Sequence, residues 1–190
     1  MKQSSSISHL TFPLFLMADT VNIRVWTQND LEVIRKITWE TWLATYAEFI
    51  PEEDLRSYFD TNYSSDKLRK LYHSVFMKGF LAEVNGVTAG CMRTFLNKEE
   101  NRFYVSSLYI LPQFQGKGIG KRLMAEAEEC ARGYHLGQVW LGVMEQNIHA
   151  LEWYKAQGFE FPEEAPFVMG KTSVNHFIGF KRIYPDTLPQ

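Results

Sequence analysis

The sequence predicts an α/β domain, and three observations along the chain support that class. A glycine-rich run over residues 115–120 separates a β-rich segment from a helical one. A nearly continuous apolar run over 138–143 is typical of a strand buried on both faces. The pair Asn85-Gly86, the commonest in two-residue hairpin turns, separates two further apolar segments. Strands and helices are therefore expected to alternate along one chain.

Turn and cap signals place the elements of the first half of the chain. Residues 21–26 alternate between apolar and polar side chains, which predicts a strand, and Asn29 or Asp30 can cap the helix after it. A proline at a helix start and a Ser-Asp pair open two further helices. The expected elements are a strand over 21–26, helices over 31–49, 51–58 and 65–77, and a hairpin of strands over 79–84 and 87–95.

The second half is predicted from the same kinds of signal. The helix that follows the glycine-rich run carries its apolar residues on one stripe and its charged residues outward. Asn147 has the side chain of an N-cap, and Gly158 can end the short helix between them. The expected elements are a strand over 103–111, a helix over 119–132, a strand over 138–143, a helix over 147–158 and a last strand over 175–184.

The glycine-rich run Gln115-Gly116-Lys117-Gly118-Ile119-Gly120 is the most informative segment of the chain. A turn between a strand and a helix leaves backbone N–H groups bare at the positive end of the helix dipole, where they can receive a phosphate. Glycine allows a ligand to approach the backbone closely and allows positive φ angles. The run therefore predicts a diphosphate-bearing ligand, although a purely structural turn is the alternative that the loop alone leaves open.

The spacing of this run argues against two common phosphate-binding loops. A P-loop has four residues between its first glycine and Gly-Lys-Ser/Thr. Here Gly116 and Gly120-Lys121 are one residue too close, and Arg122 replaces the hydroxyl that would hold magnesium. A dinucleotide-binding fold places its glycines after the first strand, with an acidic residue about twenty positions later. This loop lies past the middle of the chain, and its glycines alternate.

The run resembles instead the Gln/Arg-x-x-Gly-x-Gly/Ala signature of the GNAT N-acetyltransferase superfamily, which binds the pyrophosphate of acetyl-coenzyme A. The stretch from Asn147 to Phe159, with Ala150, Tyr154 and Gly158, resembles the second GNAT hallmark, Asn-x-x-Ala-x-x-x-Tyr-x-x-x-Gly-Phe. Two motifs in the right order are far more specific than either alone. The resemblance implies the GNAT acyl-CoA N-acyltransferase fold, a mixed and mostly antiparallel sheet flanked by helices.

Residues 140–147, 154–159 and 167–170 are similar to PaiA-type spermidine/spermine acetyltransferases of bacteria, and the likeness runs over about 21–183. It implies an N-acetyltransferase that moves the acetyl group of acetyl-CoA to a primary amine, a polyamine such as spermidine or spermine, by direct attack in a ternary complex. A protein or peptide amine as acceptor, or a non-catalytic CoA-binding regulatory module, are the alternatives.

The resemblance also implies roles for individual residues. Tyr154 matches the usual general acid, and a phenol with a pKa of about 10 stays protonated at neutral pH. Relatives often place a glutamate base on the strand before the loop, but residues 104–107 contain no carboxylate, so Glu40 or a water chain past Ser106 are the candidates. The expected coenzyme-binding residues are Leu108, Tyr109 and Ile110, then Gln115, Gly116, Lys117, Gly118, Ile119, Gly120 and Lys121, and finally Asn147 and Lys155.

The acceptor is expected between the first helices and the last strands. Glutamates and an aspartate supply negative charge there, and aromatic side chains supply apolar walls, which suits a long cation with a methylene spine. A solvated acidic helix face is the alternative interpretation. The candidate substrate-binding residues are Glu40, Trp42, Tyr46 and Glu48, with Glu52, Glu53, Asp54, Trp39 and Phe49 as neighbours on the same helices.

Composition bounds the remaining expectations. A chain of 190 residues is one domain by default, and a net charge of −2 with a pI near 6.2 gives no general attraction to nucleic acid or to anionic membranes. Cys91 and Cys130 are expected as small apolar side chains in a strand and a helix, and neither they nor His149 and His176 have metal-ligand spacing. We expect a cytoplasmic protein that binds no metal. The chain is expected to form a single domain over 17–190 after an extension over 1–16, and a homodimer is a possible assembly.

Overall fold

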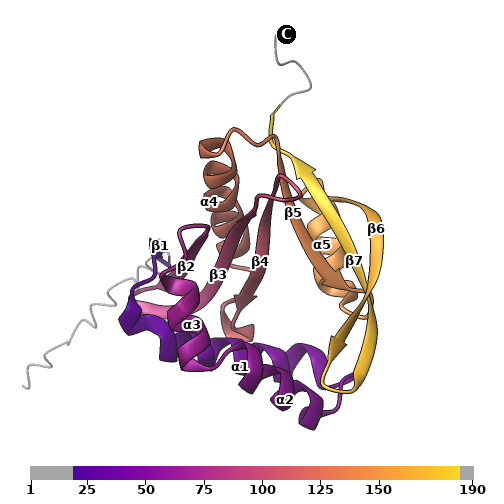
Figure 1. The fold of residues 1–190 in the computed structure, drawn as a ribbon. Coiled ribbons are helices and arrows are strands. Elements are labelled where there is room, and N and C mark those ends of the chain that lie inside the picture. Colours follow the sequence, from indigo (N-terminus) through magenta and orange to yellow (C-terminus); the bar gives the residue numbers. More distant parts are fainter. Residues whose placement is uncertain (1–18, 185–190) are drawn as a thin grey trace, which may run out of the picture.

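The computed structural model describes residues 19–184, so the predicted extension over 1–16 lies outside the described residues. Seven strands form one mixed sheet in the order β1-β2-β3-β4-β5-β7-β6, with helices on both faces (Figure 1). The elements are β1 (Val21–Val25), α1 (Leu31–Tyr46), α2 (Glu52–Asn62), α3 (Ser65–Tyr72), β2 (Met77–Val84), β3 (Val87–Asn97), β4 (Arg102–Ile110), α4 (Ile119–Gly133), β5 (Gln138–Met144), α5 (Ile148–Ala156), β6 (Glu160–Met169) and β7 (Thr172–Arg182).

Two apolar cores lie on opposite faces of the sheet. On one face α4 and α5 pack against the strands, with Leu123, Ala127 and Leu151 among the buried residues. On the other face α1, α2 and α3 pack around Trp42 and Phe59. The apolar stripe predicted for α4 is confirmed, because its inward residues are those that the sequence places at helical spacing.

The hairpin prediction is confirmed in detail. Asn85 and Gly86 have φ angles of 51° and 80°, and Val84 pairs with Val87 across the turn. Two successive positive φ angles define the turn that matches the twist of the flanking strands. The turn residues therefore determine the form of this hairpin.

The predicted order contains no strand between Gly158 and residue 175, and this prediction was wrong. β6 occupies Glu160–Met169 and pairs with β7 at the edge of the sheet. Its segment contains Pro162, Pro166 and three glutamates, which are depleted in central strands. An edge strand needs only one partner, so it tolerates prolines and charges that a central strand would exclude.

The sheet opens between its two middle strands. Among the strand pairs that residues 19–184 form, only β4 and β5 run parallel, and they pair over just three positions that end at Val105 and Leu141. Beyond that point β4 stays with β3 as far as Ile110, and β5 stays with β7 as far as Met144. The two strands therefore diverge, as Figure 1 shows, and leave a V-shaped gap at the centre of the sheet.

Candidate active site

The glycine-rich loop lies between β4 and α4 and has the backbone of an anion receptor. Gly116 and Gly118 have φ angles of 75° and 76°, and a Cβ at either position would meet no described atom within 4 Å. Within residues 19–184, no backbone N–H from 116 to 120 donates a hydrogen bond to another group. Because Gly118 is the N-cap of α4, these amides lie at the positive end of the helix dipole.

Three contacts hold the loop in place. The amide Nε2 of Gln115 donates to the carbonyl of Ile110 at 3.1 Å, which ties the loop to the end of β4. Lys117 forms an ion pair with Asp19, and the hydrogen bond from Lys117 lowers the pKa of that carboxyl. Arg122 donates to the carbonyl of Val21 at 2.5 Å. The loop and the first turn of α4 are thereby fixed to the end of β4 and to the start of β1.

Helix α5 presents the second motif. Asn147 caps it, with its Oδ1 accepting from the backbone N of Ala150 at 3.3 Å, as the sequence predicts. Asn147, Ala150 and Tyr154 recur at helical spacing and all line the same cavity. A Cβ on Gly120 would lie 2.9 Å from the ring of Trp153, so this glycine lets α4 pack closely against α5.

Tyr154 is 9% exposed, and its ring lies 5.5 Å from that of Phe159. Burial raises the pKa of Tyr154 above its ordinary value. The phenol therefore keeps its proton at every pH at which the protein is expected to work, which is the state that a general acid requires.

A cavity of about 740 Å³ occupies the V-shaped gap and extends beneath α1 and α2. On the side of the gap it is lined by Leu108 and Tyr109 of β4 and by Gly142 to Met144 of β5. On the other side its walls are largely aromatic: Trp42, Tyr46, Tyr58, Tyr63, Phe167 and His176 line it. The arrangement gives one compartment with two parts of different character, a slot between strands and an aromatic chamber.

The sequence profile described as "Acetyltransferase (GNAT) family" matches residues 32–159, which is more than half of the chain. The chain belongs to the GNAT acetyltransferase family. Its fold and its two motifs are those of the family, and the predicted mixed sheet is confirmed.

Several relatives place it more closely. It is 26% identical over 158 residues to an uncharacterized N-acetyltransferase of Lactobacillus delbrueckii, spanning 80% of this chain and 91% of the relative. It is 28% identical over 160 residues to the spermidine N(1)-acetyltransferase of Thermoplasma acidophilum, spanning 80% of this chain and 97% of the relative. The crystal structure of the PaiA N-acetyltransferase from that organism, in complex with coenzyme A, superposes with a TM-score of 0.75 at 25% identity, covering 86% of this chain and 99% of that one. The predicted resemblance to PaiA-type GNAT enzymes is confirmed.

The structure brings only some of the residues predicted for this GNAT site together. Leu108, Tyr109, Asn147 and Tyr154 line the cavity, and so do Trp42 and Tyr46. Ile110 ends β4 beside the loop, while Lys121 and Lys155 are exposed on α4 and α5. Glu40 and Glu48 lie outside the cavity lining; Glu40 is exposed and lies 3.8 Å from the ammonium of Lys36.

Asp54, another of the predicted acids, has partners outside the cavity. Asp54 is only 6% exposed, but its carboxylate accepts hydrogen bonds from the hydroxyl of Thr172 at 2.7 Å and from the backbone N of Lys171 at 2.8 Å. It therefore fastens α2 to the turn between β6 and β7. Among the described residues that line the cavity there is no aspartate or glutamate.

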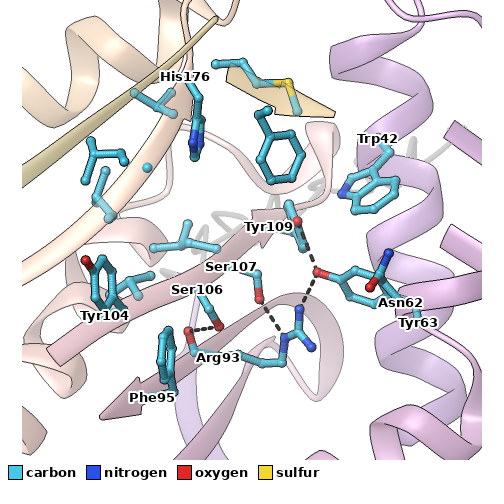
Figure 2. A pocket seen from close by; sticks show the side chains of 18 of the residues that line it. Trp42, Asn62, Tyr63, Arg93, Phe95, Tyr104, Ser106, Ser107, Tyr109 and His176 are labelled. Atoms are coloured by element: carbon cyan, nitrogen blue, oxygen red, sulfur yellow. Dashed lines mark hydrogen bonds between the residues drawn. The ribbon is translucent and has the colours of Figure 1, made fainter. Parts of the chain in front are cut away.

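Sequence reasoning missed Arg93 on β3. Its Nη2 donates to the hydroxyl of Tyr63 at 2.6 Å, and its Nε donates to the Oγ of Ser107 at 3.1 Å (Figure 2). The hydroxyls of Tyr63 and Tyr109 lie 3.3 Å apart, which extends the network along the chamber wall. A charged residue inside the otherwise apolar run of β3 was the available signal, because a partly buried charge needs partners.

His176 on β7 is the second cavity residue that the sequence pattern did not indicate. A Cβ on Gly142 would lie 2.1 Å from its imidazole, so the glycine of β5 makes room for the ring. Burial lowers the pKa of His176, which keeps the imidazole neutral at pH 7. Figure 2 shows it on the wall of the pocket opposite Arg93. A neutral imidazole in this position can accept a proton.

Ser106 occupies a bulge at the point where β4 leaves β5. Arg93 pairs with Ser107 and Thr94 pairs with Val105, so Ser106 is the extra residue. Its hydroxyl donates to the carbonyl of Arg93 at 3.2 Å. Such a bulge bends the strand and increases its twist, in keeping with the divergence of β4 from β5.

Neither a metal site nor a membrane-spanning helix is found among the described residues. No group of three or more His, Cys, Asp or Glu in residues 19–184 is placed to hold a metal ion. No helix within the same residues is long and apolar enough to cross a membrane.

Proposed function

We propose that the chain moves the acetyl group of acetyl-CoA to a primary amine by direct attack in a ternary complex. The observation that carries this proposal is the continuity of the cavity, which joins the slot between β4 and β5 to the aromatic chamber under α1 and α2. A donor in the slot and an acceptor in the chamber would meet without either having to leave. This supports simultaneous binding of both substrates.

The donor would be held largely by main-chain groups. Where β4 diverges from β5, Leu108, Tyr109 and Ile110 have no strand partner on that side among residues 19–184. Unpaired strand edges can take hydrogen bonds from an extended ligand that carries amides, as the arm of coenzyme A does. The pyrophosphate would lie on the amides of 116–120, with Gln115, Lys117 and Lys121 around it, and Asn147 and Lys155 would contact the coenzyme from α5.

The chemistry requires three proton transfers at defined atoms. The neutral amine nitrogen bonds to the acetyl carbon, the carbon–sulfur bond breaks, and Tyr154 gives its phenolic proton to the departing thiolate. The proton that the new amide nitrogen sheds then returns to the Tyr154 phenolate. An alkylammonium has a pKa of about 10.4, so nearly all of the acceptor arrives protonated and must first lose a proton. His176 is neutral, lines the chamber and is the base that this geometry favours.

A covalent acetyl-enzyme finds little support in the site. Cys91 is 1% exposed and does not line the cavity. Burial raises the pKa of its thiol to about 12, so the reactive thiolate is scarce at neutral pH. Direct transfer from the thioester to the amine is the simpler route.

A polyamine is the acceptor that the names of relatives suggest, since one relative is a spermidine N(1)-acetyltransferase. The acids expected to pair with a polyamine, Glu40 and Glu48, lie outside the cavity lining. The names of relatives therefore favour spermidine as the acceptor, but the described residues that line the chamber include no carboxylate that could pair with a polyamine. An amine panel is needed to decide.

The test of the proposed function is thiol release from acetyl-CoA with a panel of amines that includes spermidine, spermine, simple alkylamines and amino acids. We expect release that depends on the amine and saturates with both substrates. Acetyl-CoA binding without release above hydrolysis for any amine would contradict the proposal and favour a coenzyme-binding regulatory module.

A further inference from the structure

The acceptor chamber carries positive charge only. Of the described residues that line the cavity, Arg93 and Lys67 are cations and none is an aspartate or glutamate. The ammonium of Lys67 donates to Oδ1 of Asn62 at 2.7 Å, at the rim. Arg93 lies deeper, on β3 beside the strand that borders the slot. A substrate that enters this chamber therefore meets a guanidinium on its wall.

The guanidinium of Arg93 is incompletely partnered. Among residues 19–184 it has no carboxylate within salt-bridge distance, although Arg24 and Arg102 each have one at 2.8 Å. It uses Nε and one Nη2 hydrogen for Ser107 and Tyr63, and its Cζ lies 4.5 Å from the centroid of the Tyr63 ring. Arginine has five N–H donors, so three remain, both of those on Nη1 among them.

These contacts orient the side chain without neutralising it. The hydroxyls of Ser107 and Tyr63 are neutral, so they fix the plane of the guanidinium without supplying a counter-charge, and Arg93 lines the cavity. A partly buried charge without a counter-charge is costly, and an oxyanion that binds to the remaining N–H groups removes that cost. A polycation in the same place adds repulsion instead.

We propose that the acceptor is an amine that also carries a carboxylate, and that Arg93 binds the carboxylate. This inference rests on the proposed function and names the substrate class for it. Arg93 and His176 line the same pocket from different walls (Figure 2), so a carboxylate bound at Arg93 stays inside the cavity that His176 also lines. β3 is paired with β4, the strand that borders the slot, so the anchor lies on the strand next to the slot.

The aromatic walls complete the specificity. Trp42, Tyr63 and Tyr109 form one connected cluster, with ring centroids of Trp42 5.2 Å from Tyr63 and 6.2 Å from Tyr109. Such surfaces contact aliphatic or aromatic side chains of an amino acid without requiring a charge. The substrate class is therefore an amino acid with a largely apolar side chain.

Matched pairs of amines test this directly. Each pair contains an amino acid and the amine that remains when its carboxylate is removed, for example phenylalanine with phenethylamine, tyrosine with tyramine, and leucine with isoamylamine. We expect kcat/KM for thiol release to be about 10- to 100-fold higher for the amino acid, the range for charge-assisted hydrogen bonds. Spermidine is measured alongside.

Two variants assign the preference to Arg93. Arg93→Met keeps a long apolar stem and should reduce the preference to about one, while Arg93→Lys should retain part of it because the charge remains. Arg56→Met is the matched control, because Arg56 also stacks on an aromatic ring, that of Trp39 at 3.5 Å, but lies outside the cavity. The rise in melting temperature with acetyl-CoA checks that each variant is folded and binds the donor.

The outcomes separate this inference from the function on which it rests. Thiol release with equal efficiency for both members of every pair, or a preference for spermidine that Arg93→Met leaves unchanged, would overturn the carboxylate inference and leave the acetyltransferase intact. No release with any amine would overturn both. A preference for amino acids that survives in Arg93→Met would refute the role of this arginine.

Discussion

Replacement of Gly118 by leucine tests the coenzyme loop. Gly118 has a φ angle of 76°, and the Cβ of a new side chain would meet no described atom within 4 Å. The substitution therefore destabilises the folded protein only through the strain of a non-glycine residue in the left-handed region, about 1–3 kcal/mol. For a chain of this size, each kcal/mol lowers the melting temperature by about 2–4 °C.

Gly86 provides a matched control for that substitution. It lies at the β2–β3 turn with a φ angle of 80°, and its Cβ would also meet no described atom within 4 Å. Gly86→Leu should therefore lower the melting temperature of the free protein by a similar amount. Its side chain does not lie on the amides that start α4, so coenzyme binding should be retained.

The assay is the melting temperature of each variant with and without acetyl-CoA. At a concentration of 100 times Kd the ligand adds about 2.7 kcal/mol to the folded state, which corresponds to a rise of roughly 5–11 °C. We expect this rise for the wild type and for Gly86→Leu and its loss for Gly118→Leu. A full rise in Gly118→Leu, or loss of the rise in Gly86→Leu as well, would refute the placement of the pyrophosphate; Gly118→Ala repeats the test if the leucine variant does not fold.

Three further predictions follow from individual side chains. Tyr154→Phe should lower kcat by about ten- to a thousand-fold with little change in acetyl-CoA affinity, whereas Tyr134→Phe, at an exposed position, should change neither. Because burial raises the pKa of Tyr154, the ratio of wild-type to variant rates should stay constant from pH 7 to 10. A fall in this ratio within that range would contradict the role of Tyr154 as the acid. His176→Gln should lower kcat/KM by about a hundredfold or more at pH 7, and the deficit should shrink toward pH 10, where free amine becomes abundant; a deficit independent of pH would argue against a base. Asp54→Asn should lower the urea midpoint at pH 7, because the hydroxyl of Thr172 and the amide of Lys171 hold the pKa of Asp54 below its ordinary value. The stability that a depressed pKa contributes is present above the pKa of the unfolded state and is lost as the pH falls, so the difference in urea midpoint from the wild type should vanish in acid. A difference that persists in acid would count against this contribution of the Asp54 carboxylate.

Local chemistry explains which parts of the fold the sequence predicts well. The Asn85-Gly86 turn, the cap at Asn147 and the end of α5 near Gly158 each depend on a few adjacent residues. The predicted third helix ran on to residue 77, but α3 ends at Tyr72, because Met77 instead pairs with Phe95 in the hairpin. That boundary is set by a contact distant in sequence.

The acceptor side of the site was harder for a geometric reason. Glu40 and Trp42 are two residues apart on α1, which places them about 200° apart around the helix, so both cannot face the same chamber. Tyr46 is one turn beyond Trp42 and shares its face, and both line the cavity. Arg93 and His176 come from β3 and β7, and only the folded sheet brings them to one pocket.

In the proposed mechanism, donor and acceptor are bound together in the V-shaped gap before the acetyl group moves. Initial rates of thiol release, measured while acetyl-CoA and the best amine of the panel are both varied, test it most directly. Direct attack in a ternary complex predicts double-reciprocal lines that intersect. Parallel lines are the pattern of an acetyl-enzyme that forms before the amine binds, and they would contradict direct transfer in a ternary complex.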